Sequence, residues 1–373
     1  MNRKSHRIAD RMELLDASGI RKVFDLAAKL ENPINLSIGQ PDFDVPENIK
    51  DAAIQAIRDG HNKYTQTQGA AALHDAIAEH CATEFGWADA HQRPYLVTSG
   101  VSGALTLIME TLVNPGDEVL FADPYFVSYV HLTNMMGAKP VAIDTYPDFK
   151  LTPETIEASI TDKTRMMILN TPGNPTGSVY TEQELRDIAT VCEKYDLLVI
   201  ADEIYDVFCY DQKFVSIASM YNNTILVRGL SKSYAMTGWR VGWMTGPKPL
   251  IDKMTMLQQY TFVCAPSMAQ VASVEALKTD MSAEVDAYRK KRDLVFDALS
   301  EKFGLVKPGG AFYAFVPAPE GYTGSEFVSK AIENNVLIIP GNVFSGRDTH
   351  FRISYATCVE KLQEGLDILN KLA

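Results

Sequence analysis

A lysine and an arginine stand eight residues apart in the stretch 226–247, LVRGLSKSYAMTGWRVGWMTGP. Lys232 follows the run TILV at 224–227, which predicts a buried strand leading into a loop. A lysine amine that is desolvated there loses part of its proton affinity and can add to an aldehyde to form an imine. Because most lysines are solvated surface charges, this interpretation depends on the residues found elsewhere in the chain.

A carboxylate stands in a similar position after an earlier predicted strand. The apolar run 197–201, LLVIA, leads directly into Asp202. An acid at the end of a buried strand is partly desolvated and needs a cation or strong hydrogen bonds to stay ionised. The protonated nitrogen of a pyridine ring is one such cation, and imine chemistry at Lys232 is of the pyridoxal kind. Tyr205 would lie near Asp202 if the chain turns helically there.

Two proline-containing loops could bring further groups to the same place. Residues 170–177, NTPGNPTG, contain two prolines and two glycines, which restrict the backbone to few paths. This loop would present the Asn174 amide at the end of the predicted strand 165–169, although a Pro-Gly surface turn has a similar composition. In the segment DPY, the proline restricts the loop so that Tyr125 could lie flat against a ligand ring or, alternatively, close the edge of the core.

A strand-to-helix turn offers a candidate anion site. Residues 99–103, SGVSG, lie between a predicted strand and a predicted helix. The backbone N–H groups of Gly100, Val101 and Ser102, with the helix dipole, could hold a phosphate. The motif is neither a P-loop nor a complete dinucleotide-binding fingerprint, so a plain tight turn explains it equally well.

Two arginines could bind anionic groups of a ligand. Arg240 could face the same anion as the Gly100 turn. Arg352 lies in the otherwise apolar segment FRIS at 351–354, where a buried guanidinium suggests a bidentate partner such as a substrate carboxylate. A structural ion pair with one of the chain's many acids is the alternative.

These residues must be positioned by strands that alternate with helices. Short apolar strands alternating with helices predict a largely parallel sheet covered by helices on both faces. The carboxyl ends of such strands meet at one edge of the sheet, where the active sites of these folds lie. The predicted strands are 95–98, 118–121, 139–143, 165–169, 197–201 and 224–227.

The pattern changes beyond about residue 275 and predicts an α+β cap. Its predicted elements are a charged helix at 282–302, an alternating aromatic strand at 307–315, a helix at 324–335, strands at 336–340 and 351–355, and a terminal helix. The N-terminal part adds a helix at 20–30 and a small strand at 34–38. We therefore expect a large domain at 44–275 and a small domain built from 1–43 and 276–373.

Composition excludes several classes of protein. The chain has 373 residues, of which 46% are hydrophobic and 22% charged, as is typical of a folded protein long enough for two cores. Its formal charge of −12 argues against nucleic acid or an anionic membrane as a partner. The five cysteines are scattered without a C-x-x-C pair, which favours reduced thiols over disulfides or a zinc site. Without a signal-peptide pattern or a run of about 20 apolar residues, we expect a cytoplasmic location.

Together these segments resemble the class I and II aminotransferases, pyridoxal-phosphate enzymes of fold type I. The resemblance covers nearly the whole chain, and the motifs occur in the family's order. They are IGQPDF at 38–43, Tyr64 with Gly69, SGVSGAL at 99–105, PGDEV at 115–119, DPYF at 123–126, NTPGNPTG at 170–177, DEIY at 202–205, SKSYAMTGWRVG at 231–242, GGAFY at 309–313 and FRIS at 351–354.

The resemblance implies a fold with a mostly parallel central sheet and a smaller α+β domain, and pyridoxal 5′-phosphate as the cofactor. Lys232 would form the internal aldimine and then carry the proton between the substrate Cα and the cofactor. Asp202 would keep the pyridine nitrogen protonated. Asn174 and Tyr205 would hydrogen-bond the ring hydroxyl, and Tyr125 would stack on the ring.

The resemblance also implies a homodimer with shared active sites, in which Tyr64 reaches the phosphate of the partner subunit. Phosphate would otherwise be bound by Gly100, Val101, Ser102 and Arg240, and the substrate α-carboxylate by Arg352, Asn174 and the Gly39 backbone. One position departs from the pattern, because many members have a phosphate-binding serine where this chain has Gly229. We therefore expect phosphate binding to depend more on Arg240 and the Gly100 turn.

The implied reaction is transfer of an amino group between an L-amino acid and a 2-oxo acid by a ping-pong mechanism. A C–S β-lyase on the same fold would share every cofactor residue and is the alternative. A transcription regulator with this fold would carry an added DNA-binding segment, whereas the fold's own motifs begin here by about residue 35. No second arginine can be tied to a side-chain carboxylate, while Ile20 and Val23 could form an apolar lid. The substrate therefore stays open between aspartate and an aromatic or other neutral amino acid.

Overall fold

The computed structural model describes residues 8–15, 19 and 30–373. Ile20, Val23 and nearly all of the predicted helix at 20–30 lie outside these residues. Within them, no helix is both long and apolar enough to cross a membrane.

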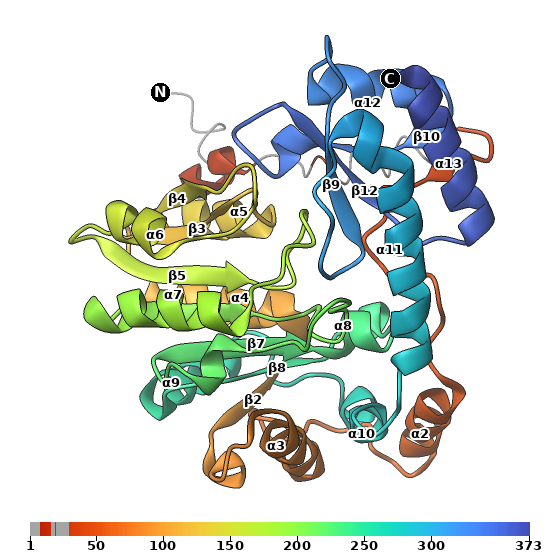
Figure 1. The fold of residues 1–373 in the computed structure, drawn as a ribbon. Coiled ribbons are helices and arrows are strands. Elements are labelled where there is room, and N and C mark those ends of the chain that lie inside the picture. The colour runs from red at the N-terminus through yellow and green to blue at the C-terminus, as the bar shows by residue number, and fades with distance from the viewer. Residues whose placement is uncertain (1–7, 16–18, 20–29) are drawn as a thin grey trace.

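A seven-stranded sheet forms the centre of the molecule (Figure 1). Its strands lie in the order β2-β8-β7-β6-β5-β3-β4, and all neighbours are parallel except β8, which is antiparallel to β2 and β7. The four residues of β8 have no counterpart among the predicted strands, because so short a segment carries little periodic signal. The strands are β2 (Tyr95–Thr98), β3 (Glu118–Asp123), β4 (Lys139–Asp144), β5 (Thr164–Asn170), β6 (Leu198–Asp202), β7 (Thr224–Gly229) and β8 (Gly242–Thr245).

Helices cover both faces of this sheet, because alternate strand residues point to opposite sides. In β6, Val199 and Ala201 belong to one core and Leu198 and Ile200 to the other. The first core is closed by α2 (Glu47–Arg58), α3 (Ala71–Phe85), α6 (Pro153–Ser159), α7 (Glu182–Lys194) and α10 (Ser267–Ala276). The second core is closed by α4 (Gly100–Leu112), α5 (Ser128–Met135) and α9 (Lys248–Gln258).

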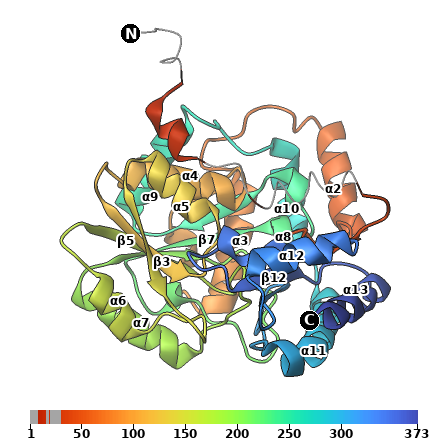
Figure 2. The same cartoon turned by 90° about the horizontal axis from the view of Figure 1, so that it is seen from above.

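The α+β part is built from both ends of the described chain, as predicted. In it, β1 (Ile34–Asn35) pairs in parallel with β10 (Val336–Leu337). A three-stranded antiparallel sheet has the order β11 (Ile339–Pro340), β12 (His350–Ser354) and β9 (Tyr313–Pro317). Its helices α11 (Ser282–Phe303), α12 (Gly324–Glu333) and α13 (Val359–Leu372) gather at one side of the molecule (Figures 1 and 2).

Local signals in the sequence set the ends of several helices. Helices α7 and α12 begin at capping boxes, Thr181 with Glu184 and Thr323 with Glu326. Helix α11 ends at Phe303 and is capped by Gly304, whose φ of 69° is in the left-handed region that glycine tolerates. The 3-10 helices are η1 (Asp10–Leu14), η2 (Ala90–Gln92), η3 (Ile217–Ser219), η4 (Thr237–Trp239) and η5 (Gly341–Val343).

Candidate active site

The carboxyl ends of β5, β6 and β7 open onto a cavity of about 300 Å³. The sequence predicted that site residues would gather at this edge, and most of them line the cavity. The predicted residues on its wall are Gly39, Val101, Ser102, Asn174, Asp202, Tyr205, Lys232, Arg240 and Arg352. Gly100, Tyr64 and Tyr125 are predicted site residues that do not line it.

Lys232 lies in the short helix α8 (Leu230–Ser233), directly after β7. Its Nζ donates a hydrogen bond to the Gly39 carbonyl at 2.6 Å. Burial, with the positive charges of Arg352 and Arg240, lowers the pKa of Lys232 to about 8. The amine is therefore available as a nucleophile and as a base near neutral pH.

Asp202 is the last residue of β6 and is only 2% exposed. Tyr129 donates its hydroxyl hydrogen to Oδ2 at 2.7 Å, and the Ile204 N–H points to Oδ1 at 3.4 Å. Burial raises the pKa of Asp202 to about 6, while the Tyr129 hydrogen bond opposes that rise. Among the residues that the structure describes, no basic side chain pairs with this carboxylate. A cationic ligand group would therefore stabilise its ionised form.

Arg352, in β12, is buried between aromatic rings at 1% exposure. Its guanidinium carbon lies 4.5 Å from the ring centroid of Tyr313 and 4.6 Å from that of Phe344. Nη1 donates to Asn174 Oδ1 at 3.0 Å and Nη2 to the Ser37 carbonyl at 2.8 Å, while Nε has no partner within the described chain. Burial lowers the pKa of Arg352. A carboxylate from outside the chain would supply the missing counter-charge.

A positively charged corner lies where α4 begins beside Arg240. Gly100, the first residue of α4, has a φ of 67°, and a Cβ there would lie 2.6 Å from Arg240 Nη2. Arg240 donates from Nη1 to the Thr237 carbonyl at 3.0 Å. The guanidinium and the first N–H groups of α4 can therefore bind one anion together. A Cβ at Gly229 would lie 3.1 Å from the side chains of Ile204 and Val101, so a serine at 229 would be crowded.

Two predicted tyrosines occupy contrasting environments. Tyr205 is buried, and its hydroxyl lies 3.0 Å from that of Tyr313. Tyr64 lies on the loop between α2 and α3 and is 82% exposed. Within one chain, Tyr64 therefore takes no part in the cavity.

Tyr125 does not lie where the stacking prediction needs it. Its ring packs edge-on against Phe121 at 5.3 Å between centroids, and it lines a separate, smaller cavity. The Tyr125 N–H donates to the Phe344 carbonyl at 2.8 Å, which fixes the turn after β3 in this orientation. Phe126, the next residue, lines the main cavity instead. The sequence predicted that a side chain of this turn would reach the site, and the structure places Phe126 rather than Tyr125 on the wall of the main cavity.

Three aromatic wall residues, Phe126, Tyr129 and Tyr313, were missed from the sequence. Phe126 lies two residues before α5, and Tyr129 is the second residue of that helix. The Tyr129 N–H donates to the Phe126 carbonyl at 3.0 Å, so their spacing of three residues could have indicated that both side chains face the same side. Tyr313 belongs to the aromatic strand β9, whose alternation does not show which face meets the site.

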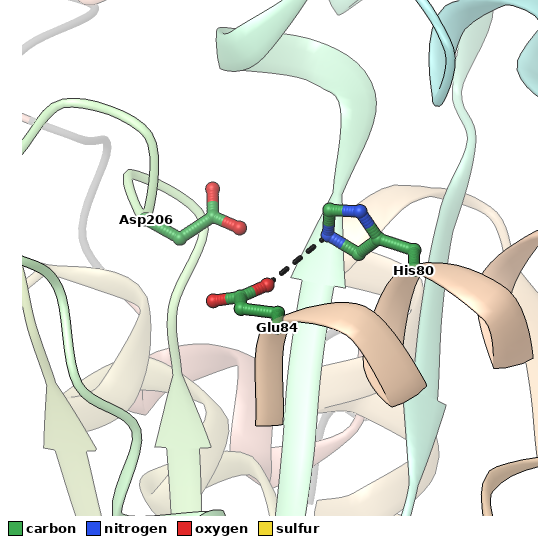
Figure 3. Close-up of side chains that lie close together, drawn as sticks. All are labelled: His80, Glu84 and Asp206. Atoms are coloured by element: carbon green, nitrogen blue, oxygen red, sulfur yellow. Dashed lines mark ion pairs between the residues drawn. The ribbon is translucent and has the colours of Figure 1, made fainter. Parts of the chain in front are cut away.

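Behind the cavity, Arg228 is buried among three carboxylates. It contacts Glu203 at 2.8 Å, Asp206 at 2.9 Å and Glu84 at 2.5 Å. Figure 3 shows that His80, Glu84 and Asp206 point toward one another, with His80 Nε2 3.2 Å from Glu84. The guanidinium already contacts both of these acids, so a metal ion among the three side chains would meet a fixed positive charge. The network joins the ends of β6 and β7 to α3.

Replacing Glu203 with glutamine is expected to flatten the pH dependence of stability between pH 6 and 8. Burial raises the pKa of Glu203 to about 8. This folded-state pKa exceeds the unfolded value of about 4.5, so protonated Glu203 stabilises the folded state. That stabilisation is fully present below about pH 4.5 and is lost as the pH rises through about 8. Asp202 has a pKa of about 6, so most of the stability change caused by its ionisation takes place below pH 6.

Urea unfolding at several pH values measures this effect. The wild-type free energy of unfolding should fall by about 2 kcal/mol more than that of Glu203→Gln across the window. Glu182→Gln, in an exposed pair on α7, should keep the wild-type slope. Equal slopes for wild type and Glu203→Gln would show that Glu203 is already ionised at pH 6.

Comparisons with known proteins agree with this geometry. The family model described as aminotransferase class I and II matches residues 31–369. The putative aminotransferase YugH of Bacillus subtilis is 39% identical over 96% of each chain, and aromatic-amino-acid aminotransferase 2 of Thermococcus litoralis is 38% identical over 98% of each. The crystal structure of the aspartate aminotransferase from Rhizobium meliloti superposes with a TM-score of 0.92 at 35% identity, covering 97% of this chain and 98% of that one. The chain therefore belongs to the class I and II aminotransferases and is a transaminase with the type I fold of that pyridoxal-phosphate family.

Proposed function

We propose that the cavity binds pyridoxal 5′-phosphate and that the enzyme works by a ping-pong mechanism between an L-amino acid and a 2-oxo acid. The observation that carries this proposal is the meeting of Lys232, Asp202 and the positive corner at Arg240 in one cavity. When bound, pyridoxal phosphate supplies an electron sink for negative charge at the substrate Cα.

The residues fit such a cofactor at each of its polar groups. Lys232 would hold it covalently through its buried amine. Asp202 would keep a proton on the ring nitrogen, and Tyr129 would hold the carboxylate in place through its 2.7 Å hydrogen bond. Tyr205 and Asn174 would bind the ring hydroxyl, and both line the cavity. The corner formed by Arg240 with Gly100, Val101 and Ser102 would bind the phosphate.

The chain's own groups would then bind the substrate and move its proton. Arg352, with Asn174 and the Gly39 backbone, would bind the α-carboxylate. Because the pKa of Lys232 is about 8, its amine can accept a proton at the substrate Cα and return it without a large energetic cost.

We further propose a homodimer with shared active sites, in which Tyr64 completes the phosphate site of the partner subunit. Its 82% exposure leaves the ring available for such a contact. We propose domain boundaries at 44–275 for the large domain and 1–43 with 276–373 for the small one. Among the cysteines, which are all free, Cys81 and Cys192 are buried, and this supports a cytoplasmic location.

We propose aspartate and aromatic or other neutral amino acids as the amino-donor candidates, because relatives are named for aspartate and aromatic substrates. The basic side chains on the described cavity wall are Lys232, Arg240 and Arg352, each with a role already proposed. Within one chain, the described wall therefore offers no further basic side chain for a second substrate carboxylate. A panel of amino donors against 2-oxoglutarate, oxaloacetate and pyruvate tests the proposal. Release of pyruvate and ammonia from cystathionine without an acceptor, with no transamination, would favour the C–S β-lyase instead.

Phe126→Ala is expected to weaken pyridoxal-phosphate binding about 10- to 100-fold, because an aromatic wall contact is worth roughly 1–3 kcal/mol. Tyr125→Ala is the matched control, since it removes a neighbouring ring that lines only the smaller cavity. Equilibrium dialysis of the cofactor measures both dissociation constants. We therefore propose that Phe126, rather than Tyr125, stacks on the cofactor ring. Weaker binding in Tyr125→Ala but not in Phe126→Ala would contradict this and favour Tyr125.

A further inference from the structure

The carbonyl that receives the Lys232 hydrogen bond belongs to a segment without helix or strand structure. Residues 36–43 run past both Lys232 and Arg352 in an irregular path. Gly39 accepts from Lys232 Nζ at 2.6 Å, and Ser37 accepts from Arg352 Nη2 at 2.8 Å. A Cβ at Gly39 would lie 2.7 Å from the Tyr313 hydroxyl, so the segment packs tightly on the cavity wall. Since no regular hydrogen-bond ladder fixes this carbonyl, its position depends on the anchors at either side.

The upstream anchor is made by backbone groups. Leu36 donates its N–H to the Leu337 carbonyl at 2.9 Å and accepts from the Ser354 N–H at 2.7 Å. These bonds continue the pairing of β1 with β10 and join the segment to the end of β12.

The downstream anchor is a side-chain cluster centred on Asp42. The Tyr288 hydroxyl donates to Asp42 Oδ1 and Lys291 Nζ donates to Oδ2, both at 2.6 Å. The Asp42 N–H also points to the Tyr288 hydroxyl oxygen at 3.1 Å. Tyr288 and Lys291 are three residues apart on α11 and so share a face of that helix. Tyr288 is 1% exposed, the Lys291 side chain 10% and the Asp42 side chain 23%, so the two donors are buried and their acceptor is partly buried.

We propose that Asp42, held by Tyr288 and Lys291, is a positioning residue that fixes the Gly39 carbonyl against the Lys232 amine. A fixed acceptor favours the protonated amine, whereas the guanidinium groups of Arg352 and Arg240 oppose it. The anchor therefore sets how strongly the site's amine holds its proton. This deepens the role proposed for Lys232 and rests on it.

The free protein provides the test, so the result does not depend on transaminase activity. The pKa of Lys232 is read from the pH dependence of its acetylation, followed by mass spectrometry of the peptide. Tyr288→Phe removes the hydroxyl without changing any charge, and Asp42→Ala removes the whole anchor. Asp211→Asn is the control. It breaks the bidentate bridge between Asp211 and Arg292, so it disturbs α11 without removing a contact to the segment that contains Gly39. Thermal unfolding of each variant confirms folding.

We expect Tyr288→Phe and Asp42→Ala to lower the Lys232 pKa by about one unit, and the double variant to shift it no further than Asp42→Ala alone. Asp211→Asn should leave that pKa unchanged even where it lowers Tm. An unchanged or raised Lys232 pKa in Tyr288→Phe and Asp42→Ala, or an equal shift in Asp211→Asn, would overturn the proposal. Failure of the donor panel with these shifts present would instead count against the proposed function alone.

Discussion

Replacing Lys232 with alanine is expected to lower kcat by at least about 10⁴-fold, because it removes both the covalent anchor and the proton-transferring base. The side chain is buried with a pKa lowered to about 8, and its amine lies 2.6 Å from the Gly39 carbonyl. No other lysine lines the described cavity wall, so within that wall no second amine stands ready to replace it. Initial rates with the best donor and acceptor, and the visible absorbance of added cofactor, measure the loss.

Two comparisons separate this effect from general damage. Lys248→Ala removes an exposed lysine paired with Asp252 on α9 and should change kcat less than about twofold. Small primary amines added to Lys232→Ala should restore part of the rate in proportion to their basicity, since the lost group acts as a general base. A Lys232→Ala protein that kept its turnover would contradict the assignment.

The sequence predicted which polar side chains would meet at one edge of the sheet, because strand topology places them there. Asp202 ends β6, Asn174 follows β5 and Lys232 follows β7, and these three strands are parallel neighbours. Their carboxyl ends must then meet at one edge, so reading the strands correctly was enough to bring the three side chains together.

The orientation of aromatic side chains could not be predicted in the same way. Whether Tyr125 or Phe126 faces the cavity depends on how the chain turns after β3, and a backbone bond to Phe344 fixes that turn. Phe344 lies more than two hundred residues further along the sequence. Tyr129 likewise reaches Asp202 only because α5 packs against the sheet in one particular register. These choices are made by tertiary contacts, which local patterns do not contain.

Replacing Arg352 with methionine is expected to lower kcat/KM for amino acids by about 30- to 5,000-fold, as truncation of a buried charged contact costs roughly 2–5 kcal/mol. The guanidinium has an unpartnered Nε and no carboxylate partner among the described residues. For a primary amine donor that lacks a carboxylate, kcat/KM should change little, because such a donor makes no contact with the Arg352 guanidinium. Steady-state kinetics with matched amino acid and amine donors measure the difference.

The stability of the free protein gives a second test. Arg292 and Arg352 are both 1% exposed, but they differ in their partners. Arg292 forms a bidentate bridge to Asp211, whose side chain is 55% exposed, and also donates to the buried Pro308 carbonyl. Arg292→Met leaves that carbonyl without its donor and should cost roughly 1–3 kcal/mol, with a lower Tm. In Arg352→Met, relief of a buried charge offsets the loss of two hydrogen bonds, to Asn174 and Ser37, and Tm should change by only a few degrees. If Arg352→Met unfolded as easily as Arg292→Met, Arg352 would be a structural ion-pair residue. We expect instead that the positive charge of Arg352 is neutralised only when the carboxylate of a substrate binds to it.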